Sequence, residues 1–418
     1  MNAPQLSPAD TAWVLVCAAL VLFMTPGLAL FYGGMVRSKH VLSMLAQNFA
    51  TIAVVSVVWA LVGFTLAFHG DAGGAGIIGD LHLAGMAHAN DPLPGMPLTV
   101  PQTAFATFQM MFAVITAALL TGAGADRMRF GAFLGFAVLW TLIVYVPLAH
   151  WSFTPHGWLA RHGLLDFAGG TVVEINAGAS ALALVLVLGK RRGWPQEQMA
   201  PHSLPLTLLG AGILWFGWFG FNAGSALASG SLAAQALLGT HLAGCGGLLG
   251  WIALEKKLTG HATTLGAASG AVAGLVAITP AAGFVNSIGA LIIGFVAGAV
   301  GLYAVRLKFR HGYDDSLDVV GVHGVCGVVG TLAVGILATR TVNPAGRGLF
   351  DGGGFHLLEW QAIGVVAAAT WAFVGTLVVA LAVHKTVGLR ATPEDEHVGL
   401  DMAVHAETAY EHGAFGAR

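Results

Sequence analysis

The segment DFAGGTVVEINAGASALALVLVL, residues 166–188, decides the fold. After Asp166 it consists almost entirely of small and apolar residues, and Glu174 is its one remaining carboxyl group. About 20 predominantly apolar residues in a helix are enough to cross the hydrocarbon core of a bilayer. An ionisable group inside such a helix is costly and therefore indicates function. We interpret residues 168–188 as a membrane helix that carries a functional carboxyl group.

The composition of the whole chain also indicates that most of it lies in a lipid bilayer. Of 418 residues, 56% are hydrophobic and only 9% are charged, whereas soluble domains have about 25% charged residues. The 59 glycines would allow membrane helices to approach closely. The formal net charge of −2 offers no electrostatic basis for binding nucleic acid. These numbers predict an all-α, polytopic membrane protein.

No cofactor or metal is predicted from the cysteines. Cys17, Cys245 and Cys326 lie in apolar stretches and show neither metal-ligand spacing nor a disulfide framework. We interpret them as small buried apolar side chains. The short polar segment Met1–Asp10 has no basic residue, so we expect no signal peptide there.

Apolar runs along the chain predict eleven transmembrane helices. They are Ala12–Tyr32, Val41–Phe68, Thr103–Gly124, Phe130–Ala149, Ala168–Leu188, Leu204–Phe221, Leu232–Leu254, Thr264–Ile278, Phe284–Val305, Val319–Leu337 and Leu358–His384. The Gly- and Pro-rich segment 69–102 has no helical period, so we expect an irregular outer loop. We assign residues 1–386 to a transmembrane domain and residues 387–418 to a polar cytoplasmic tail, which is too short to be a catalytic domain.

The basic residues predict how the chain lies in the membrane. If the N-terminus is outside, eleven crossings put fifteen of the 18 Lys and Arg residues, Arg418 included, on the cytoplasmic side and three outside. Cytoplasmic loops carry such an excess of Lys and Arg. A wrong number of spans would scramble the asymmetry. We therefore predict an N-out, C-in topology.

A repeated spacing indicates internal symmetry. Asp166 precedes Glu174 by eight residues in the fifth predicted helix, and Asp315 precedes His323 by eight residues in the tenth. Helices five positions apart in the order cross the membrane in opposite directions. This is the pattern of a five-plus-five inverted repeat, followed by a final helix, with a shared site near the midplane.

Each polar residue in these helices has two interpretations. Glu174 and His323 are either satisfied core groups or functional groups, and their equivalent repeat positions favour function. Asp166 and Asp315 begin helices, so capping and site organisation are favoured over direct contact with a cation. Asp318 could cap the tenth helix equally well. On composition alone, we interpret the aromatic residues of FATFQMMFAV (105–114) and FGWFGFNAGS (216–225) as packed core residues.

Several segments together resemble the ammonium transporter (Amt/Mep/Rh) family, in that family's order and from the first helix to the tail. They are LFMTPGLALFYGGMVRSKHVLSML (22–45), AFATFQMMFAVITAALLTGAGADRMRF (104–130), LDFAGGTVVEINAG (165–178), GWFGFNAGSA (217–226), DVVGVHGVCG (318–327) and TVGLRATPEDEHVGLD with AETAY in the tail. The resemblance implies a homotrimer in the cytoplasmic (inner) membrane, with one hydrophobic pore through each subunit. It also implies that a PII-type signal protein docks at the cytoplasmic face, against the alternative of an ordinary solvated tail.

The resemblance carries roles over to individual residues. Phe112 and Phe221 match the stacked phenylalanine gate, with Phe108 beside them on the recruitment side. Ser225 matches the hydroxyl of the outer vestibule that accepts a hydrogen bond from ammonium. The remaining matches are Asp166, the buried aspartate that organises recruitment; Trp218, which has no assigned contact; and His323, the second histidine of the pore's histidine pair.

Two positions depart from the family pattern. Glu174 replaces the first pore histidine, as in some fungal members, so the pore is expected to hold a Glu–His pair. The vestibule tryptophan appears as Phe153, and Trp151 is expected to take its place in part. Because an indole face binds cations better than a phenyl face, this change affects the affinity with which the vestibule recruits ammonium.

The predicted function is conduction of ammonium or methylammonium. Ammonium can lose a proton and cross an apolar pore as ammonia, whereas potassium cannot avoid the cost of desolvating its charge. The alternatives are an ammonium sensor, although no added signalling domain is seen, and a neutral-gas channel of the Rh type. An intramembrane enzyme is disfavoured because HExxH and paired aspartates in adjacent spans are absent.

Overall fold

The computed structural model describes residues 5–89 and 91–410. Apart from one antiparallel pairing of Met128 with Arg390, these residues contain helices and turns but no strand. The α-helices are α1 (Pro8–Met35), α2 (Val41–Val58), α3 (Phe64–Phe68), α4 (Gln102–Gly124), α5 (Phe130–Trp140), α6 (Val146–Phe153), α7 (Trp158–Arg161), α8 (Asn176–Leu188), α9 (Leu204–Gly224), α10 (Ser231–Thr259), α11 (Thr264–Ile278), α12 (Ser287–Ala304), α13 (Leu307–His311), α14 (Cys326–Leu337), α15 (His356–Thr386) and α16 (Pro393–Val398). The π-helices are η2 (Trp59–Gly63), η4 (Thr141–Tyr145), η5 (Gly170–Ile175), η6 (Val320–Val325) and η8 (Asp401–His405), and the 3₁₀ turns are η1 (Ser38–His40), η3 (Ala84–Met86) and η7 (Leu349–Asp351).

The all-helical membrane fold predicted from the apolar runs is confirmed. Within the described residues, 10 continuous helical segments are long and apolar enough to cross a membrane, and the shorter apolar helix α11 occupies the eighth predicted run. Eleven crossings and the N-out orientation stay predictions. One predicted start is wrong: Phe284 and Val285 precede α12, because the side chain of Asn286 accepts a hydrogen bond from the N–H of Gly289 and caps the helix there.

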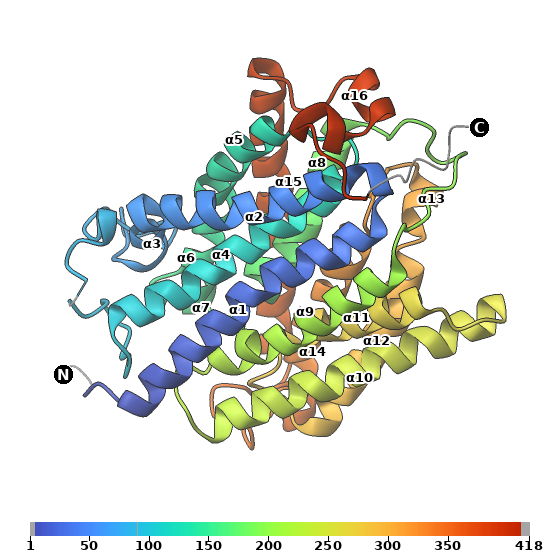
Figure 1. The fold of residues 1–418 in the computed structure, drawn as a ribbon. Coiled ribbons are helices and arrows are strands. Elements are labelled where there is room, and N and C mark those ends of the chain that lie inside the picture. The colour runs from blue at the N-terminus through green and yellow to red at the C-terminus, as the bar shows by residue number, and fades with distance from the viewer. Residues whose placement is uncertain (1–4, 90, 411–418) are drawn as a thin grey trace, which may run out of the picture.

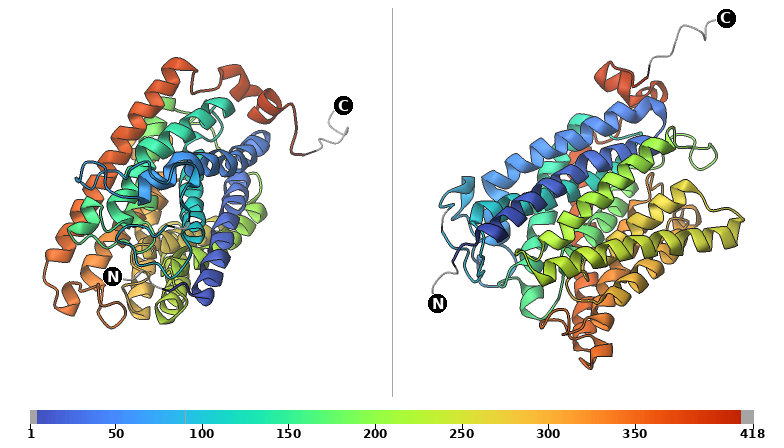
Figure 2. Two further views of the ribbon diagram at one scale, coloured as in Figure 1. Left: turned by 90° about the vertical axis from the view of Figure 1, so that its left-hand side faces the viewer. Right: turned by 60° about the horizontal axis from the view of Figure 1, so that its bottom comes forward.

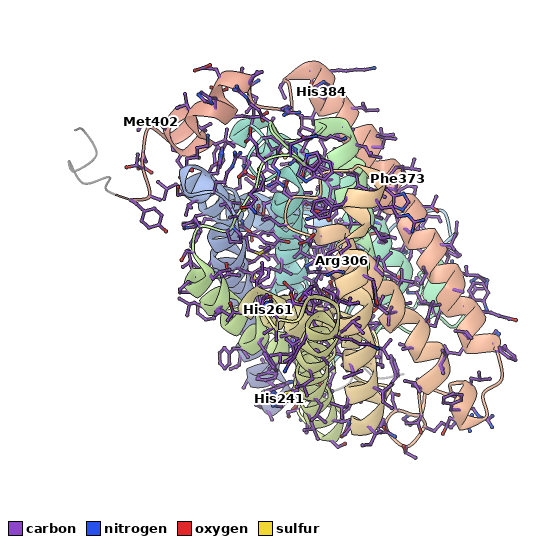
Figure 3. All side chains as sticks on the ribbon, turned by 90° about the vertical axis from the view of Figure 1, so that its right-hand side faces the viewer. His241, His261, Arg306, Phe373, His384 and Met402 are labelled. Carbon is purple, nitrogen blue, oxygen red and sulfur yellow. The ribbon has the colours of Figure 1, made fainter. Side chains whose placement is uncertain are left out.

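The helices form one bundle in which α1 packs along α9, and α10 packs against α11 and α12. The long helix α15 crosses the others obliquely (Figure 1). Only 28% of its apolar window is buried, the smallest share among the ten spanning segments of the described residues, as is expected of a helix that lies against lipid. Side chains fill the spaces between the ribbons (Figure 3).

The two ends of the bundle carry different segments. The first turn of α1 lies at one end and α16 at the other (Figures 1 and 2). Segment 69–101 lies beside the start of α1, since Ser7 N–H donates to the carbonyl of Thr99 (2.7 Å) and the Thr99 hydroxyl donates to Asp10 (2.7 Å). We call this the outer end and the opposite one the tail end. The expected irregular loop is confirmed, with η3 as its only helical turn among the described residues.

The tail is folded against the bundle rather than simply solvated. The carboxylate of Asp401 accepts hydrogen bonds from the N–H groups of Leu42 (3.0 Å) and Ser43 (2.8 Å), at the start of α2. The N–H of Ala391 donates to the carbonyl of Arg127 (2.8 Å). Residues 411–418, with Arg418, lie outside the described residues. The domain boundary at residue 386 stays a prediction.

Candidate functional site

Two π-helices carry the polar residues that the sequence singled out. Glu174 lies in η5 and His323 in η6. Oδ2 of Asp166 accepts a hydrogen bond from the N–H of Thr171, and Oδ2 of Asp315 accepts one from Val320, each at 2.7 Å. Both aspartates therefore bond the backbone five residues ahead, at the start of a π-helix. This geometry agrees with the predicted capping role, and π-helical turns are frequent at functional sites.

The local backbone repeats as well. Glu174 and His323 are 149 residues apart, and so are Gly169 and Asp318, which both have left-handed backbone angles (φ of 117° and 64°). Glycine adopts this region freely, and aspartate is one of the few other residues that tolerate it. The side chain of Asp318 does not cap the helix, contrary to one of our expectations. Its carboxylate instead pairs with Lys308 Nζ at 2.6 Å.

The two polar helices cross at glycines. A Cβ atom on Gly178 would lie 2.2 Å from Cα of Gly324, and one on Gly327 would lie 2.8 Å from Cβ of Glu174. Neither position has room for a side chain, so the two backbones are in direct contact. Small residues permit this approach between membrane helices. The crossing brings the carboxyl group of one helix within reach of the imidazole of the other.

Glu174 and His323 form a buried hydrogen-bonded pair. Nδ1 of His323 lies 2.7 Å from Oε2 of Glu174, and the residues are 5% and 1% exposed. One proton is shared in the hydrogen bond that joins these atoms, and either the imidazole or a protonated carboxyl group can be its donor.

The pair lines a narrow, mostly apolar cavity. Its volume is about 10 Å³, which is about the cavity volume needed to hold one water molecule. The other lining residues are Met24, Leu28, Phe31, Ile115, Leu119, Val173, Leu214, Trp218, Phe221 and Val272. A molecule of the size of water or ammonia fits this space, and a hydrated cation does not.

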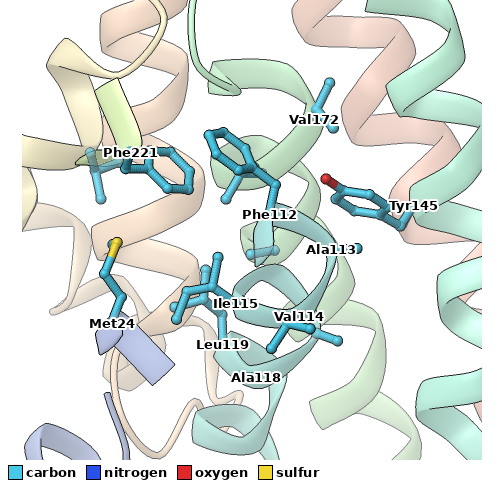
Figure 4. Close-up of a cluster of buried hydrophobic side chains, with 14 of the residues drawn as sticks. Met24, Phe112, Ala113, Val114, Ile115, Ala118, Leu119, Tyr145, Val172 and Phe221 are labelled. Carbon is cyan, nitrogen blue, oxygen red and sulfur yellow. The ribbon is translucent and has the colours of Figure 1, made fainter. Parts of the chain in front are cut away.

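Aromatic rings stack beside this cavity. Phe112 and Phe221 are stacked, with centroids 4.0 Å apart and planes 9° from parallel. The ring of Phe108 lies 4.8 Å from that of Phe112, and all three rings are buried. Figure 4 shows the Phe112 and Phe221 rings facing each other, with Met24 and other cavity-lining side chains next to them. Phe221 of this stack belongs to the cavity wall.

The hydroxyl of Ser225 lies at the end of α9, next to this stack. Its Oγ–H donates to the carbonyl of Phe221 at 2.9 Å, so the oxygen lone pairs stay available to accept a hydrogen bond. Trp218 lies one turn before Phe221, with ring centroids 5.8 Å apart. Its indole N–H donates to Thr279 Oγ1 at 2.9 Å, a partner that the sequence did not suggest.

The vestibule aromatics agree less well with expectation. Phe153 ends α6 and is half-buried against the apolar core, but within the described residues it contacts no other aromatic ring. Trp151 packs against Trp158 and Trp371 of α15, and its indole N–H donates to the carbonyl of Ile77 at 2.9 Å. Its ring is thus held against α15, and its partial replacement of the vestibule tryptophan stays a prediction.

A charged cluster at the tail end was missed by the sequence analysis. Nη2 and Nε of Arg191 donate to the carboxylate of Asp314 at 2.9 and 3.0 Å, and Arg127 Nη2 donates to the Asp314 carbonyl at 2.6 Å. Burial would raise the pKa of Asp314, but the hydrogen bonds and charge of Arg191 hold it below the usual value. Lys308 Nζ donates to the backbone carbonyl of the neighbouring Asp315 at 3.0 Å, but among the described residues no cationic side chain donates to the Asp315 carboxylate. Burial, and secondly the charge of Asp318, raise its pKa to about 6.

Apolar residues of the cavity wall were also missed. Met24, Leu28, Ile115 and Leu119 come from α1 and α4, and nothing in the sequence distinguishes them from lipid-facing residues. Both kinds of position select for the same apolar side chains. Only the packing of the helices separates them.

Comparisons with known proteins point in one direction. The model of the Ammonium Transporter Family matches residues 12–410. The ammonium transporter of Mycobacterium tuberculosis (strain ATCC 25618 / H37Rv) is 50% identical over 432 residues, which cover 96% of this chain and 90% of that protein. The crystal structure of Saccharomyces cerevisiae Mep2 superposes with a TM-score of 0.88 at 36% identity, covering 93% of this chain and 89% of that one. A structure described as "Sensor Amt Protein" superposes with a TM-score of 0.86 at 31% identity, covering 95% and 98%.

Proposed function

Because the chain belongs to the ammonium transporter family, we propose that it conducts ammonium across the cytoplasmic membrane by recruiting the cation, removing one proton and passing ammonia through the cavity beside Glu174 and His323. The observation that carries this proposal is the buried pair, joined at 2.7 Å, in the wall of a cavity of about 10 Å³ beside an aromatic stack. A proton acceptor and an apolar, water-sized space are what this scheme requires.

The cavity favours ammonia over any cation. Moving an unpaired charge into an apolar medium costs tens of kcal/mol by Born solvation. Potassium is close to ammonium in size but has no proton to lose. The wall offers only the carboxyl and imidazole groups as strongly polar side chains, too few to replace a hydration shell. Selection therefore comes from chemistry rather than from size.

Recruitment takes place at the outer side of the stack. The Ser225 oxygen accepts a hydrogen bond from ammonium, since its own proton is engaged with the Phe221 carbonyl. The Phe108 and Phe153 rings contribute cation–π attraction, which is weaker for phenyl than for indole. Asp166 acts by organisation rather than contact, because its carboxylate already accepts hydrogen bonds from three backbone N–H groups and from the Thr171 hydroxyl.

The proton leaves ammonium at the stack. Breaking one N–H bond leaves its electron pair on nitrogen, so ammonia enters the cavity. The proton is taken up by the Glu174–His323 pair, which then carries a protonated carboxyl group and an imidazolium. Release of that proton toward the tail end, followed by reprotonation of ammonia, amounts to net ammonium transport. If the proton instead returns to the outside, the protein is a neutral-gas channel of the Rh type.

The proposal includes two kinds of protein partner, which are further copies of this chain and a signal protein. The family suggests a homotrimer, with one pore in each subunit. A PII-type signal protein at the tail end would act on the tail, which is attached to the start of α2 through Asp401. The detergent-solubilised protein should retain PII in a pull-down that depends on ATP and 2-oxoglutarate. Failure under every nucleotide condition would exclude this partner.

A sensor role is the second candidate. It is favoured by the likeness to the structure described as "Sensor Amt Protein" and by the tail's attachment to the membrane domain. A sensor would bind ammonium with little transport. Uptake of methylammonium by liposomes that contain the purified protein separates the two roles.

The decisive experiment for the function is electrical. Liposomes with the purified protein are exposed to steps of ammonium or of potassium at equal concentration. We expect a current with ammonium and none above empty liposomes with potassium. Comparable potassium and ammonium currents would refute the deprotonation scheme. Ammonia-driven pH changes without current would favour the neutral-gas channel.

A further inference from the structure

Imidazole rings gather in the outer loop, away from the pathway. His69 and His82 are stacked with centroids 4.7 Å apart, and His82 and His88 are stacked at the same distance. Nδ1 of His69 donates to Oδ1 of Asp80 at 2.6 Å, and the N–H of His82 donates to the same oxygen at 3.0 Å. Asp80 therefore positions the ring of His69 and the backbone of His82.

The backbone turns the third ring toward the other two. Gly85, Met86 and His88 all have left-handed backbone angles, with φ of 70°, 59° and 54°. The N–H of Asp91 donates to the carbonyl of His88 at 2.9 Å. Left-handed angles are unfavourable for Met and cost free energy. The loop nevertheless folds back so that His88 and Asp91 meet His82.

The donor atoms of three side chains converge. Oδ2 of Asp91 lies 3.8 Å from Nε2 of His82 and 3.7 Å from Nδ1 of His88. All three atoms lie within 4.8 Å of one another. These distances are too long for hydrogen bonds, and exposed ion pairs of this kind stabilise little. Ligands around a tetrahedral zinc ion, with bonds of about 2.0–2.1 Å, are separated by roughly 3.4 Å, so small side-chain rotations would bring all three onto one ion.

We propose that His82, His88 and Asp91 form a binding site for a divalent transition-metal ion of the Zn²⁺ class at the outer end of the protein. Two imidazoles and one carboxylate suit zinc and leave the fourth position for water. The three side chains are about half exposed, so the ion enters directly from solvent. Asp80, hydrogen-bonded to His69 and to the backbone of His82, supports the ligands from outside the coordination shell.

Binding would stiffen the loop. The ion joins residue 82 to residues 88 and 91. The preceding part of the loop is already fixed, because the N–H of Trp158 donates to the carbonyl of Gly76 at 3.1 Å and the Trp151 indole donates to Ile77. The metal therefore ties residues 88 and 91 to the half of the loop that rests on α6 and α7.

The test is a zinc titration of the full-length protein, purified without a histidine tag and followed by calorimetry. The variants are His82→Ala, His88→Ala and Asp91→Asn. The matched control is His261→Ala, an exposed histidine (Figure 3) in the turn between α10 and α11, at the opposite end of the bundle. Cobalt replaces zinc in a parallel titration, because a four-coordinate cobalt site absorbs strongly in the visible range.

We expect one tight zinc ion per protomer and a four-coordinate cobalt spectrum. Each of the three variants should weaken the affinity at least about tenfold, while His261→Ala leaves it unchanged. No tight binding to the wild type, or binding that all three variants retain within twofold, would overturn the proposal. Because the altered side chains are exposed, the variants should keep the wild-type thermal unfolding temperature without zinc, which separates lost binding from lost folding.

Discussion

Nδ1 of His323 lies 2.7 Å from Oε2 of Glu174, and each residue follows, at the same spacing, an aspartate that caps the start of its π-helix. The pair is thus supported from both sides by equivalent local structure. Two chain segments 149 residues apart meet at this hydrogen bond. The arrangement agrees with a shared site at the interface of inverted repeats.

The glycine crossing beside the pair should tolerate no side chain. In Gly178→Ala the new Cβ would lie 2.2 Å from Cα of Gly324, so the helices must separate. Overpacking of this kind costs about 1–3 kcal/mol, and the separation would lengthen the Glu174–His323 contact. We expect a lower thermal unfolding temperature together with a reduced ammonium current.

Gly212→Ala is the matched control for this substitution. No atom lies within 4 Å of the position its Cβ would take in α9. Alanine in a helix interior is more stable than glycine by about 0.5–1 kcal/mol. An unchanged or raised unfolding temperature is expected. Equal behaviour of the two variants would contradict the close crossing.

Asp315 predicts a dependence of stability on pH. Burial first, and the charge of Asp318 second, raise its pKa from 3.8 to about 6, while Lys308 opposes them. The folded state therefore holds a proton that the unfolded state releases between these two values. Stability that is present below pH 3.8 is lost as the pH rises to about 6, by roughly 3 kcal/mol at 1.36 kcal/mol per pKa unit.

Asp315→Asn should remove this dependence while keeping the side-chain acceptor for the N–H of Val320. Thermal unfolding in detergent between pH 4 and 7.5 measures it. We expect the wild type to lose more stability than the variant across the window. The exposed Glu407→Gln should follow the wild type. Parallel curves for wild type and Asp315→Asn would show that this carboxyl group does not titrate in the window.

The attachment of the tail should depend on Asp401. Its carboxylate accepts hydrogen bonds from the N–H groups of Leu42 and Ser43, at the start of α2. Loss of such a cap costs about 0.5–2 kcal/mol. In Asp401→Ala we expect faster hydrogen exchange at the amides of Leu42 and Ser43 and faster proteolysis of residues 399–410. Glu407→Gln, in the same segment, should leave both rates unchanged, and equal rates in all three proteins would contradict the attachment.

Much of the fold was readable from the sequence because the bilayer imposes simple rules. A spanning helix must be apolar and long enough, so each predicted run from Ala12 to His384 contains a helix in the structure, although Phe284 and Val285 precede theirs. Ionisable residues in such runs are rare, and this made Glu174 and His323 conspicuous. Their identical spacing from Asp166 and Asp315 predicted the related local structure that the two helices share.

Other features depend on contacts that no local pattern encodes. The π-helical starts of η5 and η6 follow from carboxylates that bond the backbone five residues ahead. Asp318 pairs with Lys308 rather than capping, which depends on how α13 packs. The direction of the Trp151 ring is set by α15, a helix distant in sequence. The sequence marks the residue types at these positions but not their partners.

The central claim is that the Glu174–His323 pair handles the proton taken from ammonium. Glu174→Gln keeps the size and a hydrogen bond but cannot ionise, and Glu174→His places two imidazoles in the cavity wall. The direct measurement is ammonium-evoked current in proteoliposomes as a function of pH for the wild type and both variants. We predict that Glu174→Gln loses most of the current at an unchanged thermal unfolding temperature, and that Glu174→His conducts with a shifted pH profile. Three superimposable profiles would contradict the account and reduce Glu174 to a packed polar group.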